Sequence, residues 1–106
     1  MTELPELPVN RPTERAPTHP GELFAEILED HVKLSVAEAA VRMGITRQAL
    51  YDVLGQKAAV SAPMALRFGK LVGGDPELYL AMQAHRDLWL AQQKLRPDLD
   101  AISPVR

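Results

Sequence analysis

The chain has 106 residues, of which 46% are hydrophobic, and a net charge of −2; this composition suffices for one domain with a modest core. It has no cysteine, which excludes disulfides, thiolate chemistry and cysteine-based zinc sites. The first residues lack the basic and apolar regions of a signal peptide, and no segment has the roughly 18–20 apolar residues of a membrane span. We therefore expect a soluble, cytoplasmic protein.

Charge is distributed unevenly along the chain. Residues 1–32 hold seven acidic residues against two arginines, whereas residues 42–70 hold five cations against one acid. The five cations are Arg42, Arg47, Lys57, Arg67 and Lys70. Counterion release depends on the number of phosphates contacted and not on total charge, so this local cluster is compatible with nucleic-acid binding.

The N-terminal region predicts an arm followed by a helix. Five of the nine prolines fall in the first twenty residues, without apolar periodicity, and we expect residues 1–18 to form a mobile arm. This arm either is a frayed terminus or becomes ordered on contact with a partner. From Pro20 to Val32 apolar residues recur every three or four positions, which predicts an amphipathic helix.

Capping signals mark the next two helices. Ser35 followed by Glu38 fits a capping box and predicts the start of a second helix, which ends at Gly44. Thr46 is expected to cap a third helix directly after this turn. Two short helices separated by a glycine turn are typical of a helix-turn-helix motif.

Two further helices complete the predicted fold. Ser61 opens a fourth helix, and two glycines at 73 and 74 close it. Asp75 caps a fifth helix, which we expect to run to about Lys94 because Pro97 disfavours continuation. No alternating apolar pattern indicates strands. The predicted fold class is all-α, with five helices in a domain over residues 19–96 and a C-terminal tail over residues 97–106.

The third helix carries the candidate DNA-reading residues. Ala40, Ile45, Leu50 and Val53 have the small or apolar side chains that the packing of such a motif requires. With these positions inward, the exposed side chains at the start of the helix are Arg47, Gln48, Tyr51 and Asp52, which we assign to base contacts. Arginine can bind guanine O6 and N7, and glutamine can bind adenine N6 and N7. The alternative is that they are ordinary surface residues.

Four residues are candidates for phosphate contacts. Helix N-termini offer unpaired N–H groups and a positive dipole end to an anion, and Ser35 and Thr46 lie at two such ends. Gln56 and Lys57 follow the third helix, where they would reach the DNA backbone beside the groove. The alternatives are that Ser35 and Thr46 only cap their helices and that Lys57 only solvates a loop.

The fifth helix has more apolar residues than one domain can bury. Its apolar side chains cover more than one stripe of the helix surface, so we predict a dimer interface. The residues assigned to it are Leu78, Tyr79, Met82, Leu88 and Trp89. The alternative is that the helix packs centrally within its own domain.

The remaining chemistry-bearing residues favour no catalytic or metal site. The three histidines, His19, His31 and His85, lack metal-ligand spacing, so we expect capping or surface roles and no metal or other cofactor. No nucleophile and base stand at a recognisable spacing, and no phosphate-binding glycine loop is present. The sequence therefore does not predict an enzyme.

Two segments resemble a known family. HPGELFAEILEDH and SVAEAAVRMGITRQALYDVLGQKAAVSAPMALRFGKLVGGDPELYLAMQAHRDLW are similar to the HigA-type antitoxins of bacterial toxin–antitoxin pairs, a branch of the Cro/repressor-like (XRE) helix-turn-helix proteins. The resemblance covers about residues 19–92. It is most specific at HPGE, at the Gly-x-x-Arg-Gln that starts the third helix, at Ser-Ala-x-x-Ala-Leu-Arg and at Leu-Tyr-Leu-x-x-Gln-x-x-x-Asp-Leu-Trp.

The resemblance implies a five-helix domain that dimerises, binds double-stranded operator DNA at its own promoter and neutralises a HigB-like toxin, typically an mRNA-cleaving ribonuclease. Two departures affect the DNA contacts. Many relatives have Asn-Gly-Lys-Arg after the recognition helix, where this chain has residues 55–58 as Gly-Gln-Lys-Ala and so lacks one cation. Ala49 and Tyr51 stand where relatives often have arginine or serine, so the operator sequence cannot be carried over.

These observations together predict a homodimeric antitoxin that represses its own operon. A two-fold axis relating the recognition helices would require an inverted-repeat operator. Two alternatives stay open at the level of sequence. One is a free-standing helix-turn-helix repressor without a toxin, and the other is a helical protein-interaction module that does not bind DNA.

Overall fold

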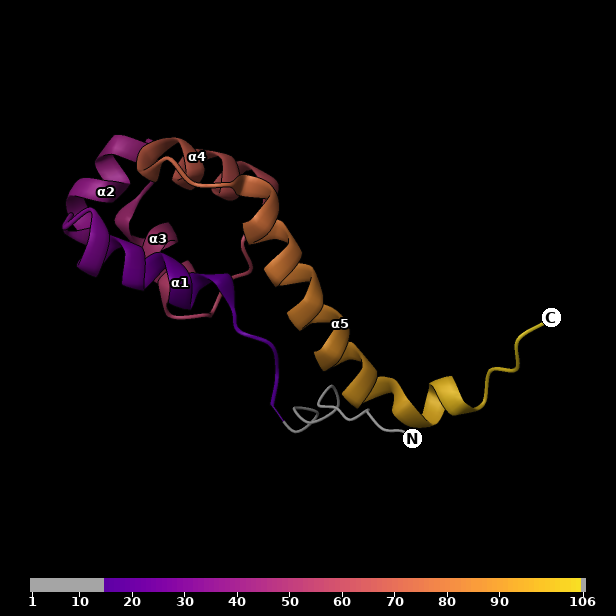
Figure 1. Cartoon of the computed structure of the whole chain (residues 1–106). Helices are drawn as coiled ribbons and strands as arrows, with labels where there is room; N and C mark the ends of the chain where they lie inside the picture. Colours follow the sequence, from indigo (N-terminus) through magenta and orange to yellow (C-terminus); the bar gives the residue numbers. More distant parts are fainter. Residues whose placement is uncertain (1–14, 106) are drawn as a thin grey trace, which may run out of the picture.

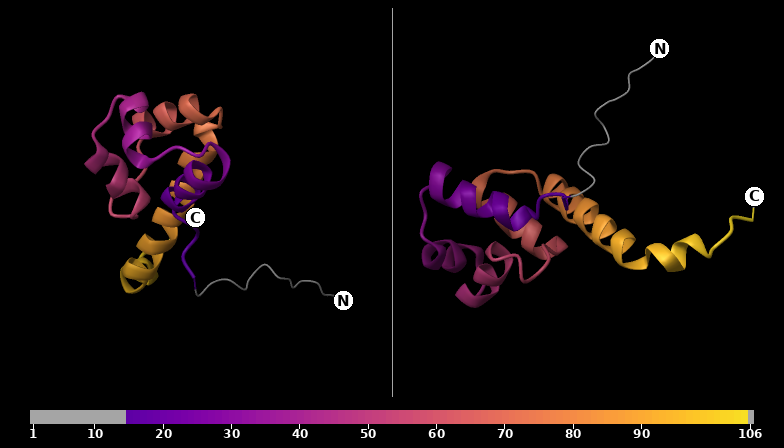
Figure 2. Two further views of the ribbon diagram at one scale, coloured as in Figure 1. Left: turned by 90° about the vertical axis from the view of Figure 1, so that its left-hand side faces the viewer. Right: turned by 90° about the horizontal axis from the view of Figure 1, so that it is seen from below.

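The computed structural model describes residues 15–105, which form helices and contain no strand. The helices are α1 (Pro20–Glu26), α2 (Val36–Met43), α3 (Arg47–Leu54), α4 (Ala62–Val72) and α5 (Pro76–Asp100). A π-helical turn, Ile27–His31, continues directly from α1. Helices α1 to α4 cluster at one end of the molecule, and α5 extends away from them (Figures 1 and 2). The predicted all-α, five-helix fold is confirmed.

The helix ends follow the local signals in the sequence. Four N-cap side chains each accept a hydrogen bond from a backbone N–H in the first turn of their helix. These caps are Ser35, Thr46, Ser61 and Asp75. Gly44 and Gly73 end α2 and α4 in the left-handed conformation, each with a φ of 72°. The predicted starts of α2 to α5 and the turn of the helix-turn-helix motif are thus confirmed.

Helix α1 begins at a buried histidine. His19 is 4% exposed; its Nδ1 accepts a hydrogen bond from the Gly21 N–H at 2.8 Å, and its Nε2 donates to the Ala58 carbonyl at 3.1 Å. Because Nδ1 accepts, the ring is neutral with its proton on Nε2. Burial lowers the pKa of His19 below its usual 6.5, and the charge of Arg86 lowers this pKa further. The expected capping role is confirmed for His19.

The N-terminal arm meets α5 where the described residues begin. Residues 1–14, most of the predicted arm, lie outside the described residues. The Pro17 carbonyl accepts a hydrogen bond of 2.9 Å from the Arg86 guanidinium of α5, and Pro17 is half-buried. The last residues before α1 therefore pack against the fifth helix.

Aromatic side chains from three helices form the centre of the core. The rings of Phe24 and Phe68 stack with their centroids 3.7 Å apart, and Tyr79 packs edge-on against Phe24 at 4.9 Å. All three are at most 2% exposed. This position removes Tyr79 from the predicted dimer interface, because its side chain is already covered by α1 and α4 of its own domain.

Helix α5 is longer than the sequence indicated. It continues past Lys94 and through Pro97 to Asp100, so the prediction that it ends near Lys94 was wrong, and the expected domain boundary at residue 96 falls inside a continuous helix. Every residue from 90 to 100 is exposed, so water can bind the Gln93 carbonyl that proline leaves without an N–H partner. Despite its length, α5 is not apolar enough to cross a membrane, nor is any other helix of the described range.

Candidate nucleic-acid interface

Helix α3 is held against the domain by one face, which leaves the opposite face exposed. Leu50 is fully buried and Val53 is 2% exposed, and α3 contacts both α1 and α2. At the crossing with α1, Gly21 lies so close to α3 that a Cβ atom would overlap the Val53 carbonyl oxygen. The Thr46 hydroxyl accepts a hydrogen bond from the Ala49 N–H at 3.0 Å and fixes the start of the helix.

The predicted base-contact residues lie together on α3 but differ in their surroundings. Arg47 and Gln48 are exposed, and Tyr51 is 51% exposed. Asp52 is half-buried, and its Oδ1 accepts a hydrogen bond of 2.9 Å from the Gln48 amide nitrogen. No residue in the range 15–105 pairs with the Arg47 guanidinium, so Arg47 keeps all its donors available. Asp52 orients Gln48, since the amide nitrogen must face the carboxylate.

Two of the five clustered cations have structural roles. Arg42 forms an ion pair of 2.9 Å with Glu38 four residues earlier on α2, with both side chains about half exposed. Arg67 of α4 donates a hydrogen bond of 2.6 Å to the Met43 carbonyl and so caps the C-terminus of α2, where a cation is favoured by the helix dipole. The spacing of Glu38 and Arg42 could have indicated their pairing from the sequence. No local signal indicates the contact of Arg67.

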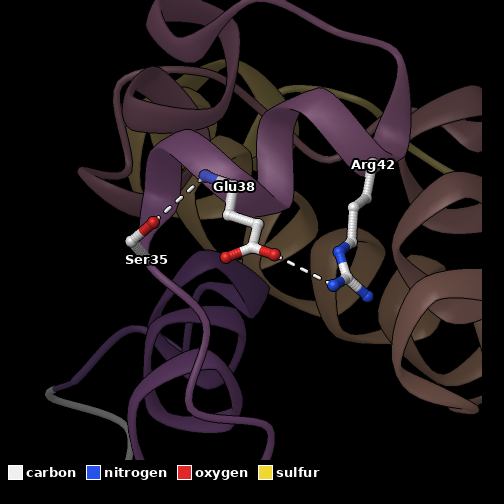
Figure 3. A network of polar contacts seen from close by, with 3 residues as sticks. All are labelled: Ser35, Glu38 and Arg42. Carbon is white, nitrogen blue, oxygen red and sulfur yellow. Dashed lines mark hydrogen bonds and ion pairs between the residues drawn. The ribbon is translucent and has the colours of Figure 1, made fainter.

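The start of α2 combines a cap with a free hydroxyl donor. Figure 3 shows the Ser35 side chain at the N-terminus of α2, where its Oγ accepts a hydrogen bond of 3.1 Å from the Glu38 N–H. This bond uses a lone pair and leaves the hydroxyl proton able to donate to a phosphate oxygen. The same holds for Thr46, and both residues are exposed. Capping and phosphate contact are therefore compatible at these positions.

The loop after α3 presents the other two predicted phosphate-contact residues. Gln56 and Lys57 are exposed, and Gln56 has a φ of 63°. The Lys57 and Ala58 N–H groups both donate to the Asp52 carbonyl, at 2.8 and 3.1 Å. The loop therefore folds back on the C-terminal turn of α3, which places Lys57 beside the recognition helix.

One side of α5 exposes a regular series of residues. Leu78 is 49% and Leu88 is 64% exposed, whereas Met82 and Trp89 are half-buried. Exposed positions recur at alternating spacings of three and four residues along this side, the heptad pattern of a helix–helix interface. They are Leu78, Ala81, His85, Leu88, Gln92, Leu95, Leu99 and Ile102, which we call the α5 apolar face. Four of the five predicted dimer residues lie on or beside this face; Tyr79 does not.

The fold and the exposed face of α3 define a helix-turn-helix protein. The chain is 30% identical to an addiction module antidote protein of the HigA family from Coxiella burnetii; the solved structure of that protein matches with a TM-score of 0.77 over 85% of this chain and 99% of its own. The chain belongs to the HigA family of antitoxins.

Further comparisons agree with this assignment. The structure of antitoxin GraA in complex with its operator matches with a TM-score of 0.77 and 28% identity over 87% of this chain and 94% of that chain. Virulence-associated protein A' of Dichelobacter nodosus is 40% identical over 73 residues, which are 68% of this chain and 63% of that relative's length. The chain thus spans somewhat less than two thirds of that relative. No family model matches the chain.

Proposed function

We propose that the protein is the antitoxin of a type II toxin–antitoxin pair: it binds its operator as a homodimer, represses its own operon and neutralises a HigB-like ribonuclease toxin. The exposed N-terminal half of α3 carries the DNA-binding part of the proposal. There Arg47 has no partner among the described residues, and Gln48 is oriented by Asp52. The operator complex of GraA, which shares the fold, supports the same use of this surface.

In this proposal α3 enters the major groove and reads bases with its first exposed residues. The Arg47 guanidinium would bind guanine O6 and N7, and Gln48 would present its amide edge to an adenine. Tyr51 lies one turn further on and is exposed toward the same groove. Because Asp52 is half-buried and engaged by Gln48, we assign it to orienting Gln48 in preference to a base contact of its own.

Phosphate contacts would surround the base contacts. Ser35 and Thr46 offer hydroxyl donors at two helix N-termini, where the dipole also attracts an anion. Gln56 and Lys57 extend this line from the loop after α3. These contacts fix the protein on the duplex without reading its sequence.

A second copy of the chain on the α5 apolar face would form the dimer. Five aliphatic side chains of this face are between 42% and 67% exposed, and they follow heptad spacing, so pairing two such helices would bury them. A two-fold dimer would place the recognition helices in successive major grooves about 34 Å apart. An inverted-repeat operator follows from this geometry.

The DNA-binding part is tested with the DNA upstream of the gene. We expect the purified protein to shift this DNA in a mobility assay, with footprinting that protects two inverted half-sites about one helical turn apart. A duplex with one half-site scrambled should bind more weakly, because only one recognition helix finds its bases. Binding no tighter than to random DNA would favour the protein-interaction alternative.

The toxin part is tested by co-expression with the small protein encoded beside this gene. We expect the two proteins to co-purify and the growth arrest caused by the toxin alone to be relieved. A variant with Arg47→Ala serves as the control, because it should lose operator binding and still relieve the arrest. Separate elution without relief would leave a free-standing repressor as the better description.

A further inference from the structure

The loop over residues 55–60 carries Lys57 and is fixed by buried groups on its C-terminal side. Loops of this length are ordinarily mobile, and ordering one on DNA would reduce the affinity. Here Lys57 itself is exposed, but Ala58 is half-buried and Val60 is 3% exposed. The position of Lys57 therefore depends on what holds the residues that follow it.

Gln83 of α5 holds the end of this loop. Its Oε1 accepts a hydrogen bond of 2.8 Å from the Val60 N–H, and its Nε2 donates to Asp87 Oδ1 at 3.0 Å. Gln83 is only 7% exposed, although it is a polar residue on the helix that extends away from the domain. The Asp87 carboxylate fixes which way the amide points, so that the oxygen faces Val60.

His19 holds the middle of the loop from the other side. Its Nε2 donates to the Ala58 carbonyl at 3.1 Å while its Nδ1 caps α1 through Gly21. Together with the two hydrogen bonds to the Asp52 carbonyl, these contacts attach the loop to α1, α3 and α5 at once. The residues held in this way are the neighbours of Lys57 on its C-terminal side.

We propose that Gln83 is a positioning residue for DNA binding: from the fifth helix it holds the loop so that Lys57 is preordered against a phosphate, with His19 as the second anchor. The proposal rests on the DNA-binding function proposed above. It assigns to α5 a part in DNA binding that is separate from dimerisation, because Gln83 faces the domain and lies outside the α5 apolar face.

The test measures operator and scrambled duplexes by fluorescence anisotropy at several salt concentrations. Gln83→Met keeps the length of the side chain and removes both hydrogen bonds. We expect it to weaken both duplexes by about three- to tenfold and to lower the salt slope, because Lys57 no longer sits preordered. Gln93→Met, at an exposed glutamine of the same helix, is the matched control and should bind as the parent does.

A double variant separates positioning from a general loss of structure. If Gln83 acts through Lys57, adding Gln83→Met to Lys57→Ala should weaken DNA binding no further. Parent-like binding by Gln83→Met, or a loss that adds in full to that of Lys57→Ala, would overturn the inference. A parent protein that binds neither duplex would instead overturn the proposed function.

A second variant covers the case in which Gln83→Met does not fold. Asp87 is exposed, and Asp87→Ala removes the group that orients Gln83 without touching the core. Removing an acid alone would tighten DNA binding by reducing repulsion of the phosphates. The positioning role predicts the opposite, a weakening of about twofold or more. Binding equal to or tighter than that of the parent would contradict it.

Discussion

Replacing Arg47 by alanine is expected to remove most of the preference for operator over random DNA while leaving the fold and the dimer unchanged. The Arg47 side chain is exposed and has no partner in residues 15–105, and Leu50 and Val53 hold α3 in place without it. A bidentate contact with guanine is worth about 1–3 kcal/mol, so operator affinity should fall roughly 5- to 150-fold. Competition binding against single-base operator variants should show relaxed preference at one base pair in each half-site.

Lys57→Ala is the matched control, because it removes a cation from the phosphate side only. It should weaken operator and scrambled DNA alike and lower the salt slope by roughly one unit. Circular dichroism and sedimentation should show both variants folded and dimeric. If Arg47→Ala binds the operator as tightly and as selectively as the parent, this residue does not read a base.

Gly21→Ala is expected to destabilise the domain strongly, although helix propensity alone predicts the reverse. Alanine is favoured over glycine by about 1 kcal/mol within a helix. A Cβ atom at Gly21 would, however, overlap the Val53 carbonyl oxygen and approach the His19 ring at 3.0 Å. The crossing of α1 and α3 must then open, which we expect to cost about 3 kcal/mol and to lower the melting temperature by roughly 12–24 °C.

Gly73→Ala provides the comparison for this substitution. Gly73 has a φ of 72°, and a Cβ atom added there would meet no other atom within 4 Å, so the change introduces backbone strain but no clash. It should cost only about 1–2 kcal/mol. Thermal unfolding of the two variants ranks the effects, and equal or smaller destabilisation by Gly21→Ala would show that α1 and α3 do not pack as closely as described.

The parts of the fold that could be predicted from sequence are those set by neighbouring residues. A cap such as Ser35 or Thr46 bonds to an N–H three residues later, so sequence spacing contains the whole interaction. The left-handed turn at Gly44 likewise depends on one residue. These signals placed α3 and its exposed residues, and Arg47 and Gln48 lie on the surface as expected.

Features that depend on distant contacts could not be read in this way. The apolar residues of α5 indicated that the helix is buried on more than one side, but spacing does not say which side meets its own core; Tyr79 packs on Phe24, 55 positions earlier in the numbering. The contact between Arg67 and Met43 and that between Gln83 and Val60 also join separate elements. The extension of α5 through Pro97 reflects exposure to water, which only the three-dimensional arrangement reveals.

The exposed leucines of the α5 apolar face have a consequence for gene control. If a second copy covers this face, the species that fills both half-sites exists only after two chains have met. At low concentration its abundance then rises with the square of the number of chains in the cell. Repression would therefore set in over a narrower range of antitoxin levels than a monomer could produce, and the side chains of one helix would set the sharpness of that response.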